Sequence, residues 1–214
     1  MEQEVDRQAL LTTLTTEHFT LQGARASTIS ESSARSALYL GSLSASLVSL
    51  GFVAQISATG DTFKVFALVV LPTLFLLGIF TFVRLVENMI EDLFYGRAIN
   101  RIRGYYLEQA GPEARYFMLS SHDDAIGVLA NMGLRTTKWQ LYFTAASAIA
   151  VVNSVVGGAA LAIACWAAFG ASLAVSGVVG SLLVLVSVPL HLRWLRRRGE
   201  RGVAVEVLSP TPAS

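Results

Sequence analysis

Three long stretches of the sequence carry no charged side chain, and they constrain the fold more than any other feature. No Asp, Glu, Lys or Arg occurs in residues 36–60, 65–83 or 139–192. An α-helix rises 1.5 Å per residue, so about 20 apolar residues cross the hydrocarbon core of a bilayer. The first two stretches each accommodate one crossing, and the third accommodates two crossings with a turn between them.

Other folds fit these stretches poorly. Strands of a membrane barrel alternate polar and apolar residues, and these stretches do not. A water-soluble helix needs a polar side, whereas only 14% of this chain is charged, against about a quarter in ordinary soluble domains. We therefore predict an all-α integral membrane protein with four transmembrane helices, near residues 37–57, 64–86, 140–167 and 171–192.

The basic residues predict the orientation. Fifteen of the 16 Lys and Arg residues lie before the first span, between the second and third spans, or after the fourth, which is one side of the predicted membrane. Only Lys64 lies on the opposite side. Because cytoplasmic loops are enriched in Lys and Arg, we expect both termini and the middle segment to be cytoplasmic and the protein to lie in the cell membrane. The predicted parts are a cytoplasmic N-terminal helical segment (1–35), a transmembrane hairpin (36–86), a cytoplasmic helical hairpin (87–138), a second transmembrane hairpin (139–192) and a basic, then disordered cytoplasmic tail (193–214).

The cytoplasmic hairpin follows from helical patterns beyond the second span. An apolar stripe at helical spacing continues to about Gln109, where Gly111 and Pro112 end it. A second helix over residues 123–135 then returns toward the third span. Near the N-terminus, Thr28 and Glu31 form a capping-box pattern, so we expect the first membrane helix to begin there, with a solvated linker as the alternative.

Small residues recur every four positions in three of the predicted spans. Spacing of four places them on one helix face, where backbones in lipid approach closely. The second span is bulkier, and we expect it to lie outermost, against lipid. The small faces predict packing within one chain, with self-association as the alternative. They comprise Ala37, Gly41, Ala45 and Ser49; Ala146, Ala150, Ser154, Gly158 and Ala162; and Ser172, Ser176 and Gly180.

Asn153 lies near the middle of the third span, beside Ser154. An unpaired amide in the hydrocarbon core costs several kcal/mol, so we expect a partner on another span. Ser46, Ser49 and Ser181 lie at a suitable depth, and a backbone carbonyl is a further candidate. This predicts an interhelical hydrogen bond, and the alternative is a polar ring in an oligomeric pore.

The first span carries a second polar pattern. Ser42, Ser46 and Ser49 share a face, Gln55 lies farther along, and Arg35 lies at the cytoplasmic end. The stripe predicts either a narrow hydrated path or serines that bond to carbonyls of their own helix.

Charged groups at the predicted inner membrane edge form two patterns. Arg84, Glu87 and Glu91 share a helix face, which favours structural ion pairing over cation binding. Arg193, Arg196, Arg197 and Arg198 form a basic cluster that we expect to contact anionic lipid headgroups.

No catalytic, cofactor-binding or metal-binding pattern is evident. The sequence lacks glycine-rich phosphate loops, nucleophile elbows and zinc spacings. In the SSHDD segment (120–124), acidic residues in a first helical turn suit the helix dipole better than they suit a metal. A net charge of +1 argues against nucleic acid. We expect no cofactor and no enzymatic activity.

These observations predict a non-catalytic multi-pass membrane protein. It would act through helix–helix self-association and a cytoplasmic helical interaction module, with the bilayer, a second copy of the chain and a cytoplasmic protein as partners. The alternative is an oligomeric ion channel or pore lined by the serines of the first span, by Asn153, or by both.

Overall fold

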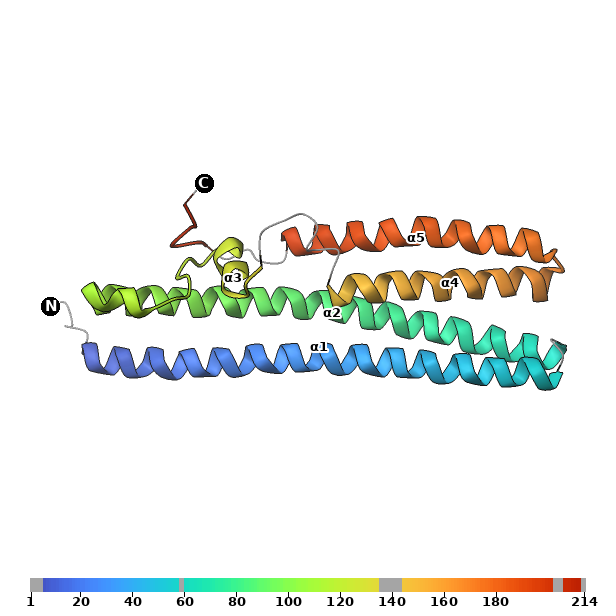
Figure 1. The fold of residues 1–214 in the computed structure, drawn as a ribbon, viewed down its shortest axis with the longest axis horizontal. Coiled ribbons are helices and arrows are strands. Elements are labelled where there is room, and N and C mark those ends of the chain that lie inside the picture. Colours follow the sequence, from blue (N-terminus) through green and yellow to red (C-terminus); the bar gives the residue numbers. More distant parts are fainter. Residues whose placement is uncertain (1–5, 58–59, 135–143, 202–205, 213–214) are drawn as a thin grey trace. The chain divides into compact units, whose positions relative to one another are not determined.

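The computed structural model is helical over most of the residues that it describes (Figure 1). It describes residues 6–57, 60–134, 144–201 and 206–212, and no strand occurs among them. The helices α1, α2, α4 and α5 are long and apolar enough to cross a membrane, as the charge-free stretches predict. The elements are α1 (Arg7–Ser57), α2 (Asp61–Ala110), the 3₁₀ helix η1 (Gly111–Tyr116), α3 (Ala125–Asn131), α4 (Ala145–Phe169) and α5 (Leu173–Arg201).

The chain divides into two compact units, and α1 and α2 contribute to both. Unit 1 comprises Met1–Glu31, Asn88–Gln140 and Arg201–Ser214, and unit 2 comprises Ser32–Glu87 and Leu141–Glu200. Unit 2 thus contains the charge-free parts of the four long helices. Unit 1 contains α3, η1 and the charged parts of α1 and α2.

Helix α1 begins well before the residue that the capping-box pattern indicates. Its first turn is capped by Asp6, whose Oδ1 accepts the backbone N–H groups of Gln8 and Ala9 at 3.0 and 3.4 Å. The helix passes through Thr28, whose hydroxyl donates to the carbonyl of Ala24, 3.2 Å away. A helix start at Thr28 is therefore wrong, because the residues before it already provide the carbonyls of a continuous helix.

Helix α4 has a defined cap at each end. Thr144 and Ser147 bond reciprocally, side chain to backbone N–H, and form a capping box at its start. Gly170 ends it in the left-handed conformation with φ of 67°, and its N–H donates to the carbonyl of Cys165. Since glycine adopts positive φ at no steric cost, the chain turns there and α5 begins at Leu173. Figure 1 shows α4 and α5 side by side.

Helix α2 lies inside unit 2, which contradicts the expectation that it is the outermost span. One third of its apolar stretch (33%) is buried, against 11% for α5 and 17% for α1. Ala67 and Leu71 of α2 pack with Leu50 of α1, and Ala160 and Ile163 of α4 pack against the same cluster. Bulky side chains suit a position between two helices because they fill the space on both sides.

In unit 1, α2 ends at Ala110, one residue beyond the predicted Gln109. The next helix is shorter than predicted, because α3 spans only Ala125–Asn131. Asp124 caps its start by accepting the N–H of Gly127 at 2.7 Å. Gly133 ends it with φ of 69°, and the N–H of Leu134 reaches back to the carbonyl of Leu129, as in a glycine-terminated helix.

Candidate functional site

The buried amide of Asn153 has a partner that the sequence analysis did not name. Its side chain is fully buried, and its Oδ1 accepts a hydrogen bond from the hydroxyl of Tyr39, 3.1 Å away. The partner is thus a tyrosine of α1 rather than Ser46, Ser49 or Ser181. Tyrosine can satisfy the amide oxygen inside an apolar bundle because its ring is apolar and only its tip is polar.

A glycine of α2 makes room for this pair. A Cβ atom added at Gly78 would lie 2.0 Å from Oδ1 of Asn153 and 2.8 Å from the hydroxyl oxygen of Tyr39. Three helices therefore meet at this point, α1 through Tyr39, α2 through Gly78 and α4 through Asn153. We call these three residues the Tyr39–Gly78–Asn153 node. The Nδ2 group of Asn153 is buried with no hydrogen-bond partner among the described residues.

Ser154 connects α4 to α5. Its hydroxyl donates to the carbonyl of Ala150 at 2.7 Å and lies 3.0 Å from the hydroxyl of Ser187. Ser187 in turn lies 3.2 Å from Nδ1 of His191, which also contacts the Ser187 carbonyl at 2.8 Å. These polar groups thus satisfy one another within the helix pair.

The small faces of α4 and α5 are in contact with each other. A Cβ added at Gly158 would lie 2.7 Å from the carbonyl oxygen of Gly180, and one added at Gly180 would lie 2.5 Å from that of Gly158. Ala162 lies beside Gly180, and Ser176 is buried. Backbones this close exclude any larger residue, so these two faces serve packing within the chain.

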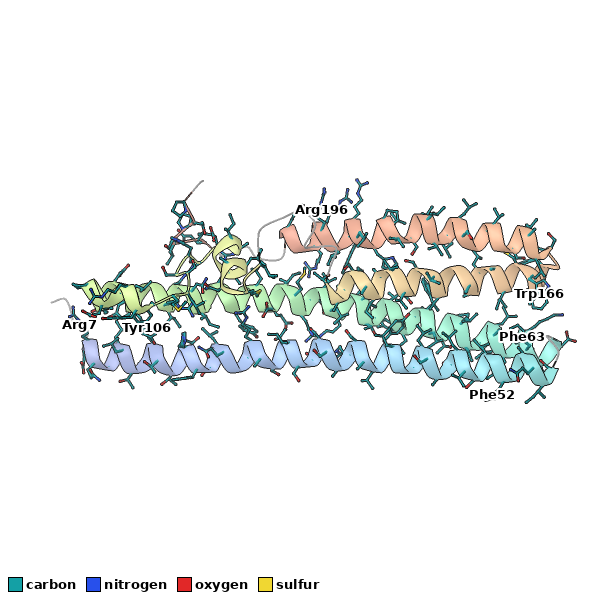
Figure 2. All side chains as sticks on the ribbon, viewed as in Figure 1. Arg7, Phe52, Phe63, Tyr106, Trp166 and Arg196 are labelled. Carbon is teal, nitrogen blue, oxygen red and sulfur yellow. The ribbon has the colours of Figure 1, made fainter. Side chains whose placement is uncertain are left out.

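The small face of α1 lies elsewhere. Ala37, Gly41, Ala45 and Ser49 are all exposed, and a Cβ added at Gly41 would meet nothing within 4 Å. The large side chains nearest this face are also exposed, among them Leu38 (72%), Val48 (59%) and Phe52 (61%). Figure 2 shows Phe52 on the side of α1 that faces away from α2 in unit 2.

The polar residues that the sequence singles out in the first span form no hydrogen bond with Asn153. Ser42 and Ser46 are half-buried, and Gln55 is exposed. Ser49 is exposed and donates to the carbonyl of Ala45, 3.0 Å away. This bond between Ser49 and its own helix agrees with the second of the two predictions for the stripe, in which the serines bond to carbonyls of their own helix.

Two of the predicted edge charges form an ion pair. Nη1 of Arg84 lies 3.4 Å from Oε2 of Glu87 on the same face of α2, which is the structural pairing that the sequence predicts. Arg35 is exposed on α1, and Glu91 is half-buried on the part of α2 that belongs to unit 1. In the described parts of the chain, no group of three or more His, Cys, Asp or Glu side chains is suited to hold a metal ion.

The four arginines at the end of α5 differ in their surroundings. Arg196 lies 3.4 Å from Glu200, and Figure 2 shows it on the outer side of α5. Arg193 and Arg197 instead line an open groove of about 410 Å³ between α2 and α5. The other residues that line it are Ile79, Phe82, Val83, Leu190, His191 and Trp194.

Aromatic contacts fix one wall of this groove. The ring of Phe82 lies 4.8 Å from that of His191 and 5.5 Å from that of Trp194, measured between centroids. Toward the other end of unit 2, Phe63 packs against Trp166 (Figure 2), and Nζ of Lys64 lies 5.5 Å from the centroid of the Trp166 ring. Tryptophan at both ends of a helix bundle is typical of membrane interfaces.

Unit 1 contains a polar cluster that the sequence analysis interpreted only as a helix start. Asp123 is 1% exposed. Its carboxylate accepts two hydrogen bonds from Arg101, at 2.8 and 3.0 Å. It also accepts the backbone N–H groups of Leu208 at 3.1 Å and Ser209 at 2.8 Å. The adjacent Asp124 accepts both the N–H and the hydroxyl of Thr211.

The C-terminal segment 206–212, which composition assigns to a disordered tail, thus lies against the SSHDD segment. The carbonyl of Ser209 accepts the N–H of Asp123 at 3.1 Å, and the guanidinium of Arg101 donates to the carbonyl of Glu206. Most of these contacts use backbone groups of the tail. No pattern of side chains in residues 206–212 could therefore have revealed them.

The electrostatics of this cluster favour ionised carboxylates. Burial alone would raise the pKa of Asp123, but the hydrogen bonds from Ser209, Arg101 and Leu208 outweigh it and hold the pKa below its ordinary value. Burial would likewise raise the pKa of Asp124, but the hydrogen bonds from Gly127 and Thr211 outweigh this effect and lower the pKa below its ordinary value. Both carboxylates are therefore ionised at neutral pH in the folded chain.

Comparison of the chain with protein-family models, with curated proteins and with solved structures finds no match.

Proposed function

We propose that this chain is a non-catalytic, four-span protein of the cell membrane that associates with a second copy of itself in the bilayer. Its two termini and unit 1 lie in the cytoplasm, where unit 1 serves as a helical interaction module. The asymmetry of the basic residues supports this orientation, because Lys64 is the only one of 16 that the proposal places outside.

The exposed small face of α1 is the observation that carries the proposal. The chain has three such faces, and those of α4 and α5 already pack against each other through Gly158 and Gly180. The face of α1 has the same chemistry and contacts no other part of unit 2 around Gly41. In lipid, close packing of small residues is a main source of attraction between helices, so this face is suited to another helix.

A second α1 is the occupant that fits this face best. Two-fold symmetry places the same residue of each copy opposite itself, so small residues meet small residues and the backbones approach closely. Ala37, Gly41, Ala45 and Ser49 follow one another at a spacing of four, which is the spacing of small residues in closely packed helix pairs of membranes. The face carries no charge that would repel its copy.

Disulfide crosslinking in membranes tests the association. In a background with Cys165→Ser, Ala45→Cys should form a covalent dimer on mild oxidation. Leu47→Cys should not, although Leu47 is 54% exposed, because two residues turn the helix by about 200°. Equal dimer formation by both variants would contradict a defined interface.

A pair of glycine substitutions tests the energetic role of the same face. Gly41→Leu should shift single-molecule photobleaching in nanodiscs from two copies toward one. Gly51→Leu is the control, because a Cβ at Gly51 also meets nothing within 4 Å while the residue lies about 100° away from the face of α1 that includes Ala45. Two copies persisting in Gly41→Leu would refute the proposal.

The channel alternative receives less support from the geometry. Asn153 is fully buried and bonded to Tyr39 within one chain, which favours an interhelical role over pore lining. The serine stripe of α1 remains the better candidate for a hydrated path, and Ser46→Leu in a liposome flux assay tests it. Ion flux that this substitution abolishes would favour the channel.

A further inference from the structure

The geometry points to a binding site for one anionic glycerophospholipid in the groove between α2 and α5. Arg193 and Arg197 would bind the phosphate of its headgroup, and the apolar side chains above them would hold the start of one acyl chain. This site goes beyond self-association and rests only on the placement of unit 2 in a bilayer. Three features of the groove support the site: its positive charge, its apolar wall and its level in the bilayer.

The charge of the groove is positive and uncompensated. Arg193 and Arg197 are one helical turn apart, so both guanidinium groups project along one side of α5. No acidic side chain lines the groove, and neither arginine has a hydrogen-bond or ion-pair partner among the residues that the structure describes. Arg196, on the outer side, already lies beside Glu200. Guanidinium groups bind phosphate in a bidentate manner, so an anionic headgroup complements this pair.

The wall that α2 contributes is entirely apolar. Ile79, Phe82 and Val83 lie on one side, and Leu190 lies opposite them on α5. An exposed apolar groove in water would be costly, whereas in a bilayer a hydrocarbon chain fills it at no cost. The occupant is thus amphipathic, with a hydrocarbon part and a negatively charged part.

The level of the groove along α5 matches the boundary between hydrocarbon and headgroups of a bilayer. From Leu190 to Arg197 the helix rises about 10 Å, and the lining changes from apolar to basic over that length. Trp194 lies at the transition, against Phe82, and tryptophan favours the level of the headgroups. A detached phosphate would satisfy only the arginines and leave the apolar part unfilled.

Quenching of Trp194 by brominated lipid tests the site in the full chain. Trp139 and Trp166 are replaced by Phe, and the protein is placed in phosphatidylcholine nanodiscs that contain brominated phosphatidylglycerol or brominated phosphatidylcholine. Quenching should saturate at a much lower fraction of brominated phosphatidylglycerol than of brominated phosphatidylcholine. Arg193→Gln with Arg197→Gln should reduce this preference about 100-fold, since each arginine loses a hydrogen bond to a charged phosphate, which contributes about tenfold.

A second double substitution separates a defined site from general attraction. Arg196→Gln with Arg198→Gln removes the same charge from the same helix but leaves the groove lining intact, so the preference should remain. Equal loss in both double variants would overturn the proposal and indicate surface electrostatics only. An unchanged preference after substitution of Arg193 and Arg197 would overturn it as well.

The apolar part of the site has its own test. Native mass spectrometry should show one phosphatidylglycerol adduct per chain on the unsubstituted protein, and Ile79→Trp, which fills the groove, should abolish it. Circular dichroism and the number of copies per nanodisc report on folding and on self-association in every variant. Loss of the lipid preference with two copies retained therefore identifies the lipid site independently of the dimer.

Discussion

Replacing Gly78 by alanine is the sharpest test of how the bundle is held together. The added Cβ would lie 2.0 Å from Oδ1 and 2.4 Å from Cγ of Asn153, far inside van der Waals contact. The carboxamide has no free direction in which to move, because Asn153 is fully buried and bonded to Tyr39. The helices must therefore separate, or the hydrogen bond must break.

The expected magnitude follows from these two effects. Overpacking in a tight core costs about 1–3 kcal/mol, and an interhelical hydrogen bond in a membrane contributes about 0.6 kcal/mol. Gly51→Ala is the control, because a Cβ there meets nothing within 4 Å and alanine favours the helix at both positions. The two variants should differ by about 2–3 kcal/mol in free energy of unfolding.

The assay is reversible unfolding in mixed detergent micelles, followed by circular dichroism and tryptophan fluorescence. Asn153→Ala supplies the second half of a double-mutant cycle, because it removes the two atoms nearest to the new Cβ and leaves space into which the Tyr39 hydroxyl, 2.8 Å from that Cβ, can move. In that background the penalty of Gly78→Ala should fall below about 1 kcal/mol, which is the coupling expected of residues in contact. A Gly78→Ala variant as stable as Gly51→Ala, or an equal penalty with and without the carboxamide, would refute the Tyr39–Gly78–Asn153 node.

Three further predictions concern the α4–α5 contact and the docked tail. Gly180→Leu should destabilise the bundle by about 3 kcal/mol in the same unfolding assay, because its side chain meets the facing backbone, whereas the exposed Ser181→Leu should be nearly neutral. Asp123→Asn should release residues 206–212 and make them sensitive to limited proteolysis of the intact protein in nanodiscs, while Glu108→Gln, at an exposed site on α2, should leave them protected. The docked tail should also be released by acid, because the pKa values of Asp123 and Asp124 are lowered in the folded chain. The two carboxylates therefore stabilise the docked tail fully above the ordinary aspartate pKa of 3.8, and this stabilisation is lost as the pH falls below that value. Tail release between pH 5 and pH 7 would contradict that assignment.

The sequence by itself determined the features that depend on local composition. The number of helices able to cross a membrane follows from where charge is absent, since the length and apolar composition of each charge-free stretch do not depend on its neighbours. The end of α2 at Ala110 follows from Gly111 and Pro112, because these residues break a helix locally. The pairing of Arg84 with Glu87 also follows, since both lie on one face of one helix.

The tertiary structure alone decided which elements meet. Tyr39 became the partner of Asn153, and Gly78 the residue that makes room for them, because the depth of a residue in a span does not specify the rotation of the neighbouring helix. Bulk in α2 indicated contact with lipid, but the packing placed that helix between α1 and α4. The docking of the tail on Asp123 uses backbone N–H groups, which every residue except proline carries, so only the folded chain could reveal it.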